Sequence, residues 1–154
     1  MGSEPLTLGF DTSAAHCAAA LLSGDRVLVT RAEEMTRGQA ERLMPLLEEV
    51  LTEGGASWRD LDRIGVGVGP GNFTGIRISV AAARGLALAL DIPAIGISTF
   101  AAIRAETRSG TPSVPAPRGM LHVDSPGEPP ALLPISKVSD AVLPPTPARL
   151  AQTI

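Results

Sequence analysis

The chain is poor in residues on which several protein classes depend. Its 154 residues include one cysteine, no tyrosine and only 3% aromatic side chains. The single thiol, Cys17, cannot form an internal disulfide and offers no thiolate cluster for zinc, so a reducing, cytoplasmic setting is expected. The scarcity of aromatic side chains disfavours a base-stacking platform for single-stranded nucleic acid.

Strong charge and long apolar runs are also missing. Thirteen Lys and Arg residues against sixteen Asp and Glu residues give a formal net charge of -3. This balance argues against a bulk electrostatic grip on nucleic acid. The longest apolar helical stretch is interrupted by Arg77, Arg84 and Asp91, and no basic region of a signal peptide precedes residue 6. We therefore expect no membrane contact.

Motifs of common enzymes are absent from the sequence. His16 and His122 are the only histidines, and they lack the spacing of metal ligands. The one lysine, Lys137, excludes a Walker A motif, and no G-x-S-x-G elbow occurs. The sequence thus predicts no catalytic residue and no metal site of its own.

Proline content divides the chain near residue 108, because ten of the fourteen prolines follow residue 110. Residues 1–108 are patterned as a globular lobe, whereas residues 109–154 are loop-rich with short strands expected at 119–123 and 132–135. In the first part, hydrophobic periodicity and turn residues predict strands at 6–11, 17–22, 26–31, 64–68 and 94–97, and helices at about 39–53, 74–90 and 99–106. This order predicts an α/β lobe with a mixed sheet and flanking helices.

Two segments are candidates for ligand binding. A carboxylate and two hydroxyls follow the first strand and could orient a metal-bound phosphate, although the same residue types favour a plain turn. The glycine-rich segment 65–77 lets a ligand or another backbone approach closely, with Thr74 as a plausible helix N-cap. The candidate cofactor-binding residues are Asp11, Thr12, Ser13, Gly69, Gly71, Thr74 and Gly75.

Two predicted helices carry apolar stripes. The helix at 74–90 is apolar or small almost all round, which indicates burial on more than one side. Either neighbouring elements of the same chain or another subunit could cover it, and the sequence leaves both open. The stripe residues expected at a partner interface are Leu43, Leu47, Leu51, Ile76, Val80, Ala83 and Ala87.

Four segments in order resemble the TsaB (YeaZ) family of bacterial tRNA threonylcarbamoyladenosine biosynthesis proteins. They are LGFDTS at 8–13, QAERLMPLL at 39–47, GVGPGNFTGIRI at 67–78 and ALALDIP at 87–93. The resemblance is almost continuous over residues 6–106. It implies an actin-like ATPase lobe (ASKHA, ribonuclease-H-like), with a second lobe that is reduced or incomplete after residue 108.

The resemblance also implies a function. Members of the family act as non-catalytic partners of TsaD, which threonylcarbamoylates the adenosine beside the anticodon of tRNAs reading ANN codons. TsaE joins the complex, the tRNA is reached indirectly, and a homodimer is expected when TsaD is absent. The helices at about 39–53 and 74–90 would form the contact, and ATP or ADP would bind at the interface with TsaD. The alternative is an actin-like ATPase or phosphotransfer enzyme that uses Asp11 and the loop at 69–75.

Overall fold

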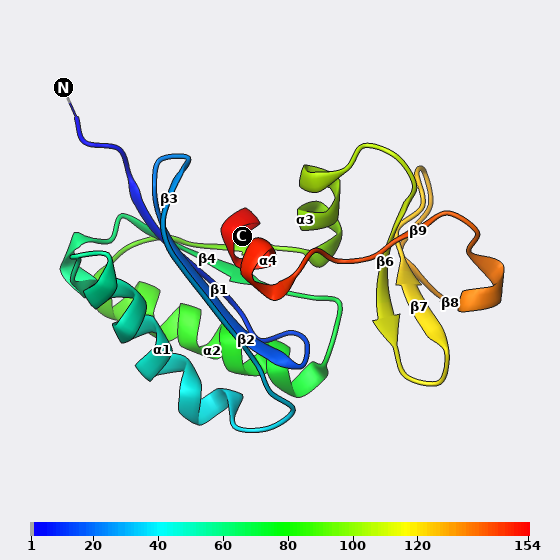
Figure 1. The fold of residues 1–154 in the computed structure, drawn as a ribbon, viewed down its shortest axis with the longest axis horizontal. Coiled ribbons are helices and arrows are strands. Elements are labelled where there is room, and N and C mark those ends of the chain that lie inside the picture. Colours follow the sequence, from blue (N-terminus) through cyan, green and yellow to red (C-terminus); the bar gives the residue numbers. More distant parts are fainter. Residues whose placement is uncertain (1) are drawn as a thin grey trace.

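A five-stranded mixed sheet forms the first part of the computed structural model, which describes residues 2–154 (Figure 1). The strand order is β3-β2-β1-β4-β5; the first three are antiparallel, and β1, β4 and β5 run parallel. The predicted succession of strands and helices is confirmed. The bounds are β1 Leu6–Asp11, β2 His16–Ser23, β3 Arg26–Glu34, β4 Arg63–Gly67 and β5 Ala94–Ile97.

Two helices, α1 (Gln39–Glu53) and α2 (Phe73–Leu90), pack on one face of this sheet (Figure 1). Strand side chains alternate, so Leu8 and Phe10 of β1 point toward the helices and are fully buried. α1 ends at a pair of glycines, Gly54 and Gly55, the second of which has φ +69°. A capping box formed by Ser57 and Asp60 begins the short 3-10 helix η1 (Trp58–Asp60).

The apolar stripe of α1 faces this sheet, which corrects the predicted partner interface. Leu43, Leu47 and Leu51 are 3% exposed or less, and Ala83 of α2 is 1% exposed. These four side chains belong to the core beneath the helices and present no surface to a partner. The reason is physical: an apolar stripe is buried first by the sheet of its own chain, and periodicity does not identify what covers it.

The opposite face of the sheet is built from small residues and carries α4 (Pro147–Thr153). Ala18 and Ala20 pack against Ala151, while a Cβ on Gly9 would lie 2.9 Å from the carbonyl oxygen of Ala151. A Cβ on Gly65 would overlap the last residue of the chain. Glycine and alanine are therefore required here because the α4 backbone lies directly on the strands.

Residues 109–154 are more ordered than the expected loop-rich segment. They form a four-stranded sheet of order β8-β7-β6-β9, preceded by α3 (Thr99–Glu106) and containing the 3-10 helix η2 (Ile135–Lys137). The strands expected at 119–123 and 132–135 are confirmed, whereas β6, β9 and α4 are not among the predicted elements. Pro112 and Pro115 interrupt the pattern of β6, and β9 and α4, of two and seven residues, are too short to show a periodicity. The strands are β6 Thr111–Ala116, β7 Met120–Val123, β8 Ala131–Pro134 and β9 Ala141–Val142. The division of the chain into two domains at residue 108 stays a prediction. The last helix, α4, follows that position in the sequence but packs on the first sheet.

Candidate functional site

The two candidate ligand-binding segments lie against each other. The Thr12 hydroxyl donates to the carbonyl oxygen of Gly75 at 2.6 Å, and the Asn72 N–H donates to the carbonyl oxygen of Ser13 at 2.6 Å. A Cβ on Gly75 would overlap the Thr12 carbonyl, and one on Gly71 would overlap that of Ser13. Both glycines are thus needed for close packing of the chain on itself.

The start of α2 differs by one residue from the prediction. Asn72 is the N-cap, and its Oδ1 accepts a hydrogen bond from the Gly75 N–H at 2.9 Å. The proposed cap, Thr74, lies inside the first turn instead, because the helix already begins at Phe73. The cap uses a donor that a bound anion would otherwise need.

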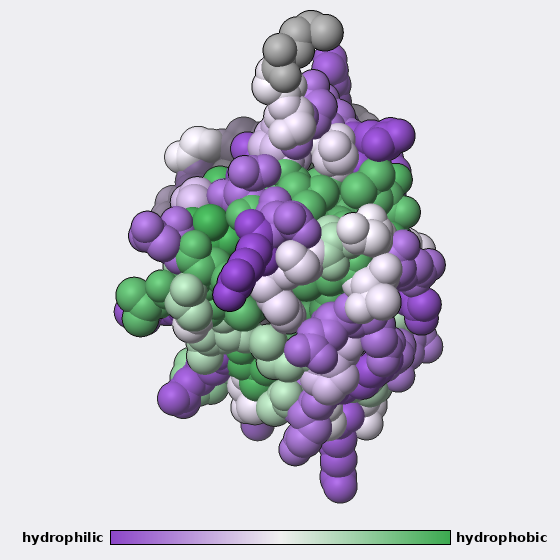
Figure 2. Space-filling view, turned by 90° about the vertical axis from the view of Figure 1, so that its left-hand side faces the viewer, coloured by the Kyte–Doolittle hydropathy of each residue, from purple (hydrophilic) through white to green (hydrophobic). Residues whose placement is uncertain are grey.

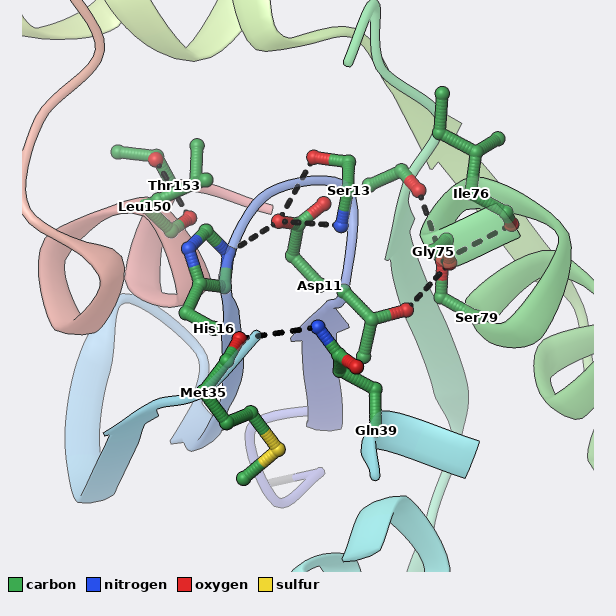
Figure 3. A network of polar contacts seen from close by, with 12 residues as sticks. Asp11, Ser13, His16, Met35, Gln39, Gly75, Ile76, Ser79, Leu150 and Thr153 are labelled. Atoms are coloured by element: carbon green, nitrogen blue, oxygen red, sulfur yellow. Dashed lines mark hydrogen bonds and ion pairs between the residues drawn. The ribbon is translucent and has the colours of Figure 1, made fainter. Parts of the chain in front are cut away.

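Asp11 is fully buried at the end of β1, and its carboxylate holds the β1–β2 turn together (Figure 3). Its Oδ2 accepts from the Ser13 N–H at 3.2 Å, from the Ser13 hydroxyl at 2.9 Å and from Nε2 of His16 at 2.6 Å. Among residues 2–154, Oδ1 of Asp11 is the buried side-chain oxygen without a hydrogen-bond partner. It occupies the space that a side chain on Gly67 would need.

A cleft of about 650 Å³ separates the end of the first sheet from the second sheet. His16 and His122, far apart in the sequence, both line it, a juxtaposition that their spacing did not suggest. Across the described residues, its lining contains no arginine or lysine. A nucleoside triphosphate would therefore find no cationic partner in this lining, so the cleft fits a nucleotide poorly.

The seven predicted cofactor-binding residues do not converge on this cleft. Ser13 and Gly71 line it, whereas Thr74 and Gly75 line a separate hollow of about 550 Å³ between the starts of α1 and α2. The remaining three, Asp11, Thr12 and Gly69, are buried. The Thr12 hydroxyl donates its hydrogen bond to the carbonyl oxygen of Gly75, so both residues already have a structural role in joining the β1–β2 turn to α2.

Cys17 lies on the helix side of β2, fully buried. Burial raises the pKa of its thiol from 9.0 to about 11, with the negative charge of Glu33 acting in the same direction. The folded state therefore holds the proton more tightly than the unfolded state. The thiol's contribution to stability is complete below pH 9 and is lost as the pH rises toward 11.

We expect the free energy of unfolding to fall by about 2 kcal/mol between pH 9 and pH 11 because of Cys17. Urea denaturation of the chain and of Cys17→Ala across this pH range measures the effect. Few other side chains titrate between pH 9 and pH 11, since the chain has no tyrosine and one lysine. Equal pH slopes in the two proteins would refute the assignment.

One face of α2 is exposed and partly apolar. Phe73 is 72% and Leu88 86% exposed, and Arg77, Ala81 and Arg84 lie between them on the same stripe. The Arg77 guanidinium stacks 5.4 Å from the centre of the Phe73 ring. Figure 2, which views the end of the molecule where α2 finishes, shows apolar surface bordered by polar side chains.

By length and composition alone, α2 could cross a membrane. Here its Ser79 and Ala83 are buried, and it packs on β4 and α1. The two arginines lie on its exposed side. These contacts are those of a helix in the outer layer of an α/β lobe.

Comparison with known proteins gives consistent matches. The sequence model of the family described as TsaD, tRNA N6-adenosine threonylcarbamoyltransferase, matches residues 31–125. The TsaB protein of Escherichia coli (strain K12), named for tRNA threonylcarbamoyladenosine biosynthesis, is 38% identical over 93 residues, which are 60% of this chain and 40% of that protein. The chain spans less than half the length of the curated TsaB relatives it matches.

Two solved structures resemble the chain over most of its length. A Pseudomonas aeruginosa protein described as similar to the peptidase YeaZ is 30% identical, with a TM-score of 0.73 over 88% of this chain and 69% of that one. YeaZ from Pseudomonas aeruginosa is also 30% identical, with a TM-score of 0.69 over 84% of this chain and 68% of that one. The fold is the actin-like, ribonuclease-H-like α/β fold.

Proposed function

The chain belongs to the TsaB (YeaZ) family, and from that premise we propose that it acts in tRNA threonylcarbamoyladenosine biosynthesis as a non-catalytic subunit that docks on TsaD. TsaD would supply the chemistry and the contact with tRNA in the cytoplasm, and TsaE would join the same assembly. Without TsaD, two copies of this chain would pair through the same face. Any ATP or ADP would be shared with TsaD at the interface.

The exposed stripe of α2 is the observation that supports docking most directly. Leu88 and Phe73 are large apolar side chains left in solvent on one helix, at 86% and 72% exposure. Such side chains at a contact are desolvated by a partner, which favours association. Ile76, Val80 and Ala87, predicted at the interface from the sequence, are half-buried beside the stripe, and their partner role stays a prediction.

The non-catalytic role is supported by what the polar residues already do. Asp11, the residue an actin-like phosphotransfer site would need, accepts three internal hydrogen bonds. The glycine-rich loop packs on the Asp11–Ser13 turn. The Asp11–Ser13 turn and the glycine-rich loop therefore hold the start of α2 in place, which is consistent with a chain whose α2 contacts a catalytic partner.

We expect Leu88→Glu to weaken binding to TsaD about 100-fold, because complex formation would bury an unpaired carboxylate. The measurement is co-purification and titration calorimetry with TsaD from the same organism. Leu132→Glu is the matched control: Leu132 is an exposed leucine on β8, 51% exposed, in the second sheet. It should bind as the unmodified chain does.

Both variants change exposed side chains, so neither should alter the unfolding temperature. Unchanged affinity of Leu88→Glu would contradict docking through α2. ATP turnover by the purified chain alone would contradict the non-catalytic role, and the actin-like ATPase alternative would replace it.

A further inference from the structure

His16 keeps one ring nitrogen free for a ligand. Its Nε2 bonds Oδ2 of Asp11, and Figure 3 shows the other nitrogen on the far side of the ring, toward Leu150. Among residues 2–154, no group forms a hydrogen bond with this Nδ1. The Nδ1 atom is not completely buried, because it is not one of the fully buried polar atoms that lack a partner. The side chain is only 7% exposed, and His16 lines the cleft, so the small accessible part opens there.

The bond to Asp11 determines what Nδ1 offers. Oδ2 of Asp11 also accepts two hydrogen bonds from Ser13, as expected of an ionised carboxylate. Nε2 of His16 therefore carries the proton in this pair. In the neutral imidazole, Nδ1 is then a hydrogen-bond acceptor, held in one orientation by the buried carboxylate.

The cleft walls favour a flat, uncharged ligand. Most of the lining is apolar, and its rigid part consists of prolines from both sides of the cleft. Flat proline surfaces pack well against aromatic rings. No arginine or lysine of the described residues lines the cleft, so a phosphate or carboxylate would be desolvated without a counter-charge. The lining prolines are Pro70, Pro115, Pro117, Pro144, Pro145 and Pro147.

We propose that this cleft binds an uncharged aromatic molecule bearing a hydroxyl group, which donates a hydrogen bond to Nδ1 of His16. The ring of the ligand packs against the proline wall. Asp11 acts as a positioning residue, because it touches the imidazole and not the ligand. Phe73 belongs both to the cleft lining and to the α2 stripe, but His16 and the proline wall lie outside that stripe. The tests use different variants, Leu88→Glu for docking and His16→Phe for the cleft, so either proposal can fail without the other.

The test compares, on the full chain, two probes that share the 4-methylphenyl ring and its oxygen atom. Para-cresol carries the hydroxyl donor, whereas 4-methylanisole has the same ring with the hydroxyl methylated. We expect para-cresol to bind about tenfold more tightly, as one hydrogen bond to a positioned acceptor predicts. It should also shift the ¹⁵N resonance of Nδ1 in His16, measured by NMR of histidine-labelled protein.

Two variants separate His16 from the rest of the cleft. His16→Phe keeps the ring and leaves Asp11 with its two bonds from Ser13, and it should bind both probes equally. His122→Phe alters another histidine of the lining and should keep the preference for para-cresol. Equal binding of the two probes to the unmodified chain, or a preference that survives His16→Phe, overturns the proposal. Displacement of para-cresol by lower concentrations of ADP would overturn it too, by showing an anion site.

Discussion

Replacing Gly75 by alanine is expected to destabilise the chain by about 3 kcal/mol. The new Cβ would overlap the carbonyl oxygen of Thr12, far inside the distance that real Cβ atoms keep. That carbonyl belongs to the backbone of the β1–β2 turn, so no side-chain rotation relieves the contact. The turn must move away from α2, which breaks the hydrogen bond from the Thr12 hydroxyl to residue 75.

A second glycine on the same helix is the matched control. A Cβ on Gly85 meets nothing within 4 Å, and Gly85 is exposed in the helix interior. Gly85→Ala should therefore stabilise the chain by up to about 1 kcal/mol, since alanine favours helix and restricts the unfolded chain. Urea denaturation measures both changes. If the two variants shift the midpoint in the same direction, close approach of the loops is not what requires Gly75.

Asp11→Ala is expected to lower stability by about 4 kcal/mol. The substitution removes the acceptor of three buried donors: the Ser13 N–H, the Ser13 hydroxyl and Nε2 of His16. Each donor left without a partner costs roughly 1–3 kcal/mol, and only part of this is recovered if water enters from the cleft.

Asp11→Asn serves as the graded comparison for this prediction. The amide oxygen can replace Oδ2 as the acceptor, while its NH₂ group takes the place of Oδ1 beside Gly67, where Asp11 has no partner. We expect about half of the loss seen with alanine, by thermal and urea unfolding. An alanine variant as stable as the parent would show that the carboxylate network does not hold the turn.

Much of the first sheet could be predicted because its pattern repeats along the strands. The alternation of Leu8 and Phe10 in β1, and the turn residues between β2 and β3, specify strands and a hairpin without reference to distant residues. The end of α1 at two glycines is likewise a local signal. These predictions were confirmed because local preference and tertiary packing agree there.

Other features depend on contacts that no local pattern encodes. The apolar stripe of leucines on α1 predicts an interface, but the sequence does not show that the sheet of the same chain covers these leucines. The pairing of Asp11 with His16 requires the β1–β2 turn to bring back two residues five positions apart. The meeting of His16 and His122 at one cleft requires the second sheet, in which β6 contains two prolines that hide its strand pattern in the sequence.

The helix on the small-residue face of the first sheet has a consequence for biosynthesis. Gln152 of α4 bonds Thr30 of β3, across 122 positions. While the ribosome is still adding residues before 147, the patch around Gly9 and Ala20 is bare, and its strands lack their covering layer. Native closure must wait until that late segment has left the exit tunnel, so a chaperone acting on the nascent polypeptide would meet this patch uncovered.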